Sequence, residues 1–236
     1  MSSGLALETG RGRWKWYPAY KDSGVEWLGE VPEHWTFLPL KRNWQVTDCK
    51  HKTVSFIDEG VPVASIGEVQ DIDVDLYNAK MTTSEEYREL IDGGRKPKRG
   101  DIIYSRNATV GAAAFVNTDI DFCMGQDVCP ISSKTNSQRF LVYQLRSLVV
   151  MNQLESLVVG ATFKRINVAQ IKNFIVACPS QKEQDAIAIH CDKVAHRNDI
   201  FIAKVHESIS KLREYRTALI SAAVTGKIDV REESAP

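Results

Sequence analysis

The sequence predicts an α+β protein: one domain of mixed strands and helices, followed by a long C-terminal helix that forms a coiled coil. Three observations lead to this prediction. Short apolar runs of strand length, separated by glycines, occur before the C-terminal quarter of the chain. A stretch without Gly or Pro at 138–158 has the pattern of a buried helix. A second such stretch, 181–225, is much longer and carries an apolar heptad repeat.

Four segments have the length and apolar character of strands. Glycines such as Gly60, Gly100 and Gly111 mark turns between them. Residues 138–158 carry Leu141, Leu145 and Leu148 at helical spacing, which predicts one mostly buried helix. These elements do not alternate as regular βαβ units, and this favours the α+β class. The predicted strands are 61–69, 101–105, 112–117 and 173–177.

The C-terminal helix has clear signals at both ends. Ser180 and Glu183 form a capping box, in which the Ser hydroxyl accepts from a first-turn amide and the Glu side chain reaches back. Gly226 offers a left-handed C-cap, with Lys227 beside the negative end of the helix. A helix of about 45 residues would be about 67 Å long at about 1.5 Å per residue.

Apolar residues along this helix follow a 3-4-3-4 spacing, interrupted by Asn198 and Arg216. Heptads sustained over this length favour a coiled coil. The alternative is a long helix packed along its own domain, but so long a helix needs a partner over its whole length. The expected dimerisation residues are Ile202, Val205, Ile209, Leu212, Leu219 and Ala223.

The composition is that of an ordinary globular protein. The 236 residues include 30 Lys and Arg and 30 Asp and Glu, so the net charge is zero. This excludes a protein coated in basic charge but permits a local basic face for nucleic acid. The five cysteines form no C-x-x-C pair, and residues 1–16 are polar, without a signal peptide. We expect reduced cysteines, a cytoplasmic location, no membrane span and a flexible leader at 1–16.

No set of catalytic or metal-binding residues is evident. The sequence has no phosphate-binding glycine loop and no Asn/Asp-Pro-Pro-aromatic motif of the amino-methyltransferases. Cys123 and Cys129 are a poor zinc pair, and residues 71–82 lack the glycine and glutamate of an EF-hand. The adjacent His190 and Cys191 would point in different directions on a helix. We therefore expect no enzymatic activity, no metal and no cofactor.

Three basic motifs point towards nucleic acid. The glycine-flanked loop 95–99 could approach a phosphate backbone, although a solvated turn explains that loop equally well. Arg106 and Asn107 close a strand, and Arg and Asn make bidentate contacts to guanine and adenine. Residues 160–165 form a second glycine-led basic turn. The phosphate-contact candidates are Arg95, Lys96, Lys98, Arg99, Lys164 and Arg165, and the base-contact candidates are Arg106 and Asn107.

Residues 20–35, YKDSGVEWLGEVPEHW, resemble the opening signature of the specificity (S) subunits of type I restriction–modification systems. Later segments resemble motifs of that family in the same order, and the resemblance covers about residues 17–230. They are GDIIYSRN at 100–107, TFKRIN at 162–167, IKNFIV at 171–176, PSQKEQ at 179–184 and AAVTGKI at 222–228.

The resemblance implies a non-catalytic DNA reader. It implies a DNA target recognition domain at 17–178, a spacer and dimerisation helix at 179–226 and a tail at 227–236. In that family a recognition domain reads half of a bipartite site, and the long helix spaces two domains and docks methyltransferase (M) subunits. The expected partners are therefore double-stranded DNA, an M subunit and a restriction (R) subunit. Trp27 and Trp35 would fasten the opening segment to the recognition domain.

Family members usually carry two recognition domains and two spacer helices, whereas this sequence shows one of each. It resembles a half-length specificity subunit, which we expect to form an antiparallel homodimer through its long helix. Two alternatives stay open. One is an inactive or regulatory half-subunit that dimerises with full-length specificity subunits. The other is a stand-alone nuclease or methyltransferase, against which the missing motifs count.

Overall fold

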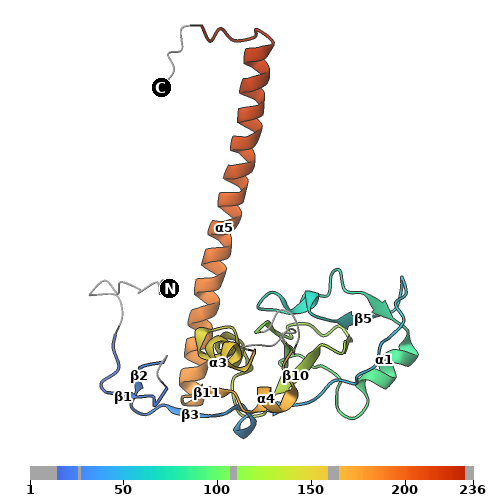
Figure 1. Ribbon diagram of the computed structural model, residues 1–236, viewed down its shortest axis with the longest axis vertical. Coiled ribbons are helices and arrows are strands. Elements are labelled where there is room, and N and C mark those ends of the chain that lie inside the picture. Colours follow the sequence, from blue (N-terminus) through green and yellow to red (C-terminus); the bar gives the residue numbers. More distant parts are fainter. Residues whose placement is uncertain (1–14, 26–27, 107–110, 159–164, 232–236) are drawn as a thin grey trace. The chain divides into compact units, whose positions relative to one another are not determined.

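The computed structural model describes residues 15–25, 28–106, 111–158 and 165–231. The chain divides into two compact units, residues 1–188 and 189–236. The predicted α+β class is confirmed: the first unit mixes short strands and helices, and α5 (Gln181–Val224) is one long helix (Figure 1). The division falls inside α5, because Gln184 and Ala188 near its start are buried in the first unit.

A four-stranded antiparallel sheet with the order β4–β10–β7–β8 supports the first unit. Ile102 and Tyr104 of β7 belong to one apolar core, and Ile103 between them belongs to a second. This is the period-two alternation of a strand covered on both faces. It explains why the sequence of β7 is apolar throughout. The strands are β4 (Gln45–Val46), β7 (Ile102–Ser105), β8 (Ala113–Phe115) and β10 (Val128–Ser132).

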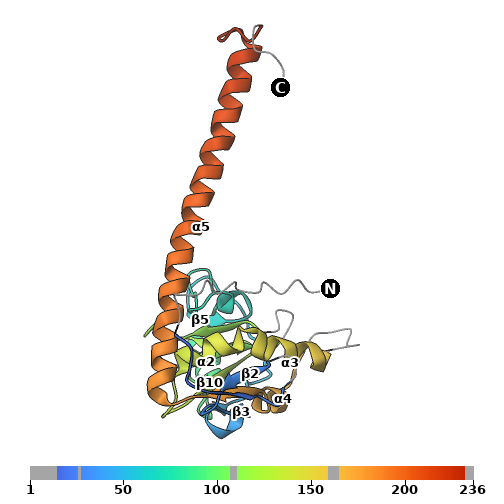
Figure 2. The same cartoon turned by 90° about the vertical axis from the view of Figure 1, so that its left-hand side faces the viewer.

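Three helices complete the first core, and Figure 2 shows α2 and α3 one after the other beside the sheet. The single helix expected over 138–158 is in fact two. Ser147 separates them, because its hydroxyl donates to the Gln144 carbonyl at 2.8 Å and accepts from the Val149 N–H at 3.2 Å. The break leaves Leu148, which we expected on the buried face, 74% exposed. The helices are α2 (Gln138–Leu145), α3 (Leu148–Val158) and α4 (Val168–Lys172).

A smaller sheet has β5 (Val61–Ala64) at its centre, antiparallel to β6 (Met81–Thr82) and parallel to β9 (Cys123–Met124). The strand expected over 61–69 ends at Ala64. The Glu68 carboxylate accepts the Ser65 N–H at 2.8 Å and turns the chain into the 3-10 helix η2 (Gly67–Val69). The helix α1 (Ser84–Ile91) packs next to β9.

The other three expected strands are present with shifted ends, as β7, β8 and β11 (Ile175–Cys178).

The strand β11 pairs with β3 (Thr36–Pro39), and two glutamines occupy its other edge. Gln144 donates to the Ala177 carbonyl at 3.0 Å and accepts from the Ala177 N–H at 2.7 Å. Gln153 forms the same pair of bonds with Ile175, at 2.9 and 2.8 Å. Side-chain amides thus take the place of a third strand, which satisfies the backbone and fixes α2 and α3 on β11.

The opening segment forms a hairpin of β1 (Tyr20–Asp22) and β2 (Glu30–Pro32), followed by aromatic contacts to the start of α5. The His34 Nε2 lies 2.7 Å from Glu183 Oε1, and the Trp35 indole N–H donates to the same oxygen at 3.4 Å. The expected capping box is confirmed, because Glu183 accepts the Ser180 N–H at 3.2 Å and donates its own N–H to Ser180 Oγ at 3.4 Å. Trp35 thus links the opening segment to the start of the long helix, whereas we expected it to fasten that segment to the recognition domain; Trp27 lies outside the described residues.

In the second unit, α5 continues to Val224 and ends at the predicted glycine. Gly226 has a φ of 71°, and its N–H donates to the Ala223 carbonyl at 3.1 Å while the Lys227 N–H donates to Ala222 at 2.8 Å. These two bonds form a Schellman motif. Among the described residues, no helix combines the length and apolar character that a membrane crossing needs.

Glu183 makes the attachment of the opening segment sensitive to acid. Hydrogen bonds, first from His34 and then from Ser180, lower the pKa of Glu183 to about 2. A depressed folded-state pKa gives stability that is present above the ordinary carboxyl value and is lost as the pH falls through the folded value. We therefore expect the difference in free energy of unfolding between wild type and Glu183→Gln to shrink steadily as the pH falls below about 4.5.

Urea unfolding between about pH 3 and pH 7 measures this difference. Glu207→Gln is a matched control, because Glu207 lies on the same helix in an exposed pair with Lys211. A difference for Glu183→Gln that stays constant over the whole range would contradict the assignment.

Candidate nucleic-acid interface

Arg106 follows β7 directly and is buried, with 6% of its side chain exposed. Its guanidinium forms an ion pair with Asp48, donates to the Ile166 carbonyl at 3.4 Å and lies 3.5 Å from Cys49 Sγ. Its backbone N–H also donates to the Asp127 carbonyl at 2.8 Å. In this position the guanidinium supports the surrounding chain. Our expectation that Arg106 contacts base edges therefore has no support in its geometry.

The described residues that flank the two polar loop motifs nevertheless lie side by side in the first unit. Asn107 and Lys164 lie outside the described residues, but the residues that flank these loops are in contact. The Ile166 N–H donates to the Arg106 carbonyl at 3.0 Å, across 60 positions of sequence. Arg165 beside it has 45% of its side chain exposed and lies 3.5 Å from an Asp127 oxygen. The chain thus enters the loop after Arg106 next to the point where it leaves the loop before Arg165.

The Arg95–Arg99 loop has the highest density of basic residues in the sequence, yet its charges are largely engaged within the protein. Lys96 pairs with Asp121 at 2.7 Å. Arg99 binds both oxygens of Asp119 at 2.8 Å, and this bidentate contact lowers the pKa of the Asp119 carboxyl. The first arginine of the loop donates to two backbone carbonyls. Neighbouring carboxylates therefore cancel much of the field that the sequence suggests.

Asp48, Cys49 and His51 bring three potential metal ligands within 4.8 Å of one another. Arg106 already supplies a cation to this group, because its guanidinium contacts both the Asp48 carboxylate and the Cys49 sulfur. Burial is the largest cause of a raised pKa of the Cys49 thiol, which disfavours the thiolate that a metal would bind. The geometry accordingly favours a structural role for this group.

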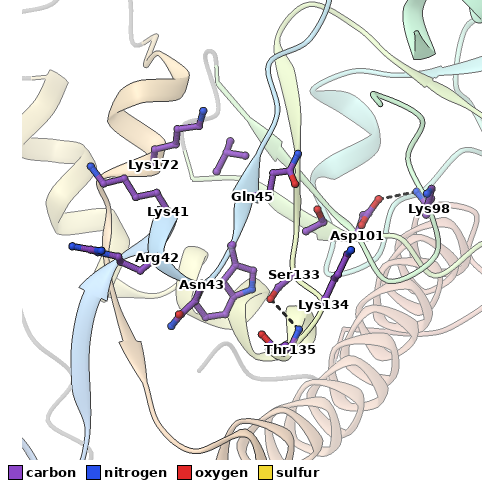
Figure 3. Close-up of a pocket in the computed structure, with 13 residues that line it drawn as sticks. Lys41, Arg42, Asn43, Gln45, Lys98, Asp101, Ser133, Lys134, Thr135 and Lys172 are labelled. Carbon is purple, nitrogen blue, oxygen red and sulfur yellow. Dashed lines mark hydrogen bonds between the residues drawn. The ribbon is translucent and has the colours of Figure 1, made fainter. Parts of the chain in front are cut away.

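Sequence reasoning missed a basic hollow of about 710 Å³ in the first unit. Figure 3 shows Lys41, Arg42 and Lys172 on one side of it, and Lys98 and Lys134 on the other. These cations come from η1 (Leu40–Arg42), α4 and two loops, and only Lys98, a predicted phosphate contact in the Arg95–Arg99 loop, belongs to a motif evident in the sequence. The lining consists of Lys41, Arg42, Asn43, Trp44, Gln45, Val46, Lys98, Asp101, Ser132, Ser133, Lys134, Thr135 and Lys172.

A unit of mixed strands and helices, followed in the sequence by one long helix, has the architecture of a DNA specificity domain. The chain belongs to the family described as "Type I restriction modification DNA specificity domain", whose model matches residues 43–209. The resemblance inferred from the sequence motifs is thus confirmed.

Two curated relatives are the type I restriction enzyme specificity subunits StySPI of Salmonella potsdam and EcoKI of Escherichia coli K12. The chain is 22% identical to each, over 85% of its own length and 44% of theirs. It therefore spans about half the length of the curated relatives that it matches.

Two solved structures share the fold. One, from work on "complex assembly and conformational transition of the type I R-M system", matches 86% of this chain and 48% of its own, with a TM-score of 0.65 and 16% identity. The HsdS subunit of Thermoanaerobacter tengcongensis matches 89% of this chain and 48% of its own, with a TM-score of 0.57 and 16% identity.

The burial of Arg106 predicts that its removal affects folding before it affects any ligand. Arg106→Met leaves the Ile166 carbonyl and Asp48 without their partner, and we expect the free energy of unfolding to fall by about 1–3 kcal/mol. Arg165→Met, at an exposed position with one long ion pair, should change it by less than about 0.5 kcal/mol. Urea unfolding of both variants measures the difference. An Arg106→Met protein of wild-type stability that had lost DNA binding would restore Arg106 as a direct DNA contact.

Proposed function

We propose that this chain is the DNA-recognition module of a type I restriction–modification complex. It reads one half of a bipartite site in double-stranded DNA and docks the methyltransferase and restriction subunits, in the cytoplasm. Membership of the specificity-domain family supports this proposal, as do the relatives named as specificity subunits. Because the chain spans under half of those relatives, the division of labour within the complex is part of the proposal.

The observation that carries the proposal is the hydrogen bond between Arg106 and Ile166, the described residues that flank the two loop motifs. The segment around Arg106–Asn107 and the turn at 160–165 are far apart in sequence, but Arg106 and Ile166 hydrogen-bond to each other. Loops held by a rigid scaffold are where base-reading side chains are expected. Within these loops, Asn107 is the proposed base contact, and Lys164 and Arg165 are the proposed phosphate contacts.

The chain itself is proposed to be non-catalytic. The sequence carries neither the phosphate-binding loops nor the amino-methyltransferase motif that such chemistry uses. A nuclease or methyltransferase acting alone is the weaker alternative for the same reason. Methyl transfer would then belong to a partner subunit.

A methyl-transfer assay tests this division. The purified chain, incubated with DNA and labelled S-adenosylmethionine, should incorporate no label. The same chain with the methyltransferase subunit of its own system should direct the label to one target sequence. The proposal would be contradicted if the chain alone incorporated the label and this methyl-transfer activity co-purified with the chain through successive columns.

We also propose that the apolar seam of α5 pairs with a second copy of this chain. In the second unit, Ile202, Val205, Ile209, Leu212 and Leu219 are between 41% and 67% exposed. An exposed apolar row at heptad spacing is the surface that a second helix covers in a coiled coil. Two copies related by a two-fold axis would present identical readers and would recognise an inverted repeat.

Substitution of two seam residues tests the pairing. Ile209→Asp with Leu212→Asp places unpaired charges in the interface of both copies, and we expect monomers in sedimentation at micromolar concentration where the wild type is dimeric. Ser210→Asp with Thr217→Asp adds the same charge outside the seam and should leave the dimer intact.

A wild-type monomer at micromolar concentration would contradict self-pairing. If that monomer associated through α5 with a full-length specificity subunit, the regulatory half-subunit would be the better account.

A further inference from the structure

We propose that the basic hollow binds the sugar–phosphate backbone of duplex DNA, independently of base sequence. The inference rests on the proposed DNA-reading function, and it assigns a second contact surface outside the loops at Arg106 and Arg165.

The hollow concentrates charge in a chain whose net charge is zero. Its lining holds five cations and one carboxylate. That carboxylate, Asp101, accepts the backbone N–H of Lys98 at 2.9 Å. In the part of the chain that the structure describes, none of the five cations forms an ion pair with a carboxylate. Lys41, for example, donates to the neutral Asn173 amide oxygen at 2.8 Å, and this leaves its charge uncompensated.

The contrast with the Arg95–Arg99 loop is informative. Lys96 and Arg99 belong to the densest basic run, yet both face aspartates. Of that loop only Lys98 lines the hollow; the other four cations come from other segments, and Asp101 is the one acid among the lining residues. A polyanion would gain most where positive potential is not already cancelled, because each phosphate contact there releases a condensed counterion.

The chemistry of the wall fits DNA better than an acidic protein surface. The residues that line the hollow and reach its surface are polar or charged, with hydroxyls of Ser133 and Thr135 and amides of Asn43 and Gln45 beside the cations, although carbon atoms also contribute to its surface. The apolar lining residues, Trp44 and Val46, are each only 3% exposed. Protein–protein interfaces are enriched in aromatic residues and depleted in Lys and Ser, whereas interfaces with DNA are more polar and more basic. Hydroxyls and amides are also common donors to phosphate oxygens.

The elements that carry the cations are held by the core. Lys41 and Arg42 follow Leu40, which is fully buried and whose N–H donates to the Phe174 carbonyl at 2.8 Å. Lys172 follows Ile171, which is also fully buried. On the opposite side, Ser133 Oγ accepts backbone N–H groups of the two residues after Lys134, at 3.3 and 3.2 Å. Charges fixed in this way fit an extended anion whose phosphates are regularly spaced.

The test uses the full chain and fluorescently labelled duplexes without the target sequence, in anisotropy titrations over a series of salt concentrations. For Lys41→Ala with Arg42→Ala we expect the affinity for every duplex to fall about ten-fold or more. The slope of log affinity against log salt should decrease in magnitude by about 2, since each phosphate contact contributes about 0.9. The ratio of target to non-target affinity should stay unchanged.

Lys96→Ala with Arg99→Ala is the matched control, because it removes two cations of the same types that are paired with Asp121 and Asp119. It should change neither the affinity nor the slope by more than a small fraction of the effect in the hollow. Lys134→Glu, on the opposite side, should weaken binding in the same sequence-independent way. Thermal unfolding by circular dichroism checks that each variant folds.

The outcomes separate the two proposals. A wild type that binds no duplex at any salt concentration contradicts the proposed function and this inference together. A wild type that binds DNA while the variants of the hollow bind equally well contradicts the inference alone. Equal losses of DNA affinity in the variants of the hollow and in the control variant would show an effect of net charge. Variants of the hollow that bind DNA normally but no longer bind the methyltransferase subunit would show that the hollow is a protein-binding face. Either result overturns the inference.

Discussion

The ion pair between the buried Arg106 guanidinium and the partly exposed Asp48 carboxylate is the constraint on which the candidate interface depends. A guanidinium with 6% exposure requires partners on several sides, because an uncompensated buried charge is costly. Those partners come from the chain after β4 and from the approach to α4, and the Arg106 backbone N–H also donates to the Asp127 carbonyl just before β10. Satisfying one cation therefore fixes the positions at which both polar loops leave the scaffold. Buried cations of this kind position a surface even when they do not reach the ligand.

Local chemistry explains which parts of the fold could be predicted from the sequence. Both ends of α5 were predicted correctly, because Ser180, Glu183 and Gly226 act through hydrogen bonds to residues only a few positions away. The break at Ser147 was missed because a serine in an apolar helical pattern does not show whether its hydroxyl will end the helix. The run at 61–69 was overextended because the turn depends on Glu68 reaching back to Ser65.

The candidate site was harder to predict than the fold. Whether a basic side chain is paired with a carboxylate depends on residues that only the folded structure brings next to it. The densest basic run was visible in the sequence, but the aspartates that face Lys96 and Arg99 lie beyond it, at Asp121 and Asp119. The basic hollow could not be predicted as a site, because its cations come from four separate segments that only the fold brings together. Residue type and position favour Arg106 as a base reader, but the sequence does not show its burial, which favours a structural role instead.

Selection of duplexes from a random-sequence pool by the purified chain is the measurement that tests the central claim most directly. The account predicts enrichment of one inverted repeat, with half-site centres about one helical turn, or roughly 10 base pairs, apart. Members of the pool without the repeat should be retained weakly and in a strongly salt-dependent manner. A pool that stays random in sequence after repeated rounds, although the chain is folded, would contradict the claim that this protein reads DNA.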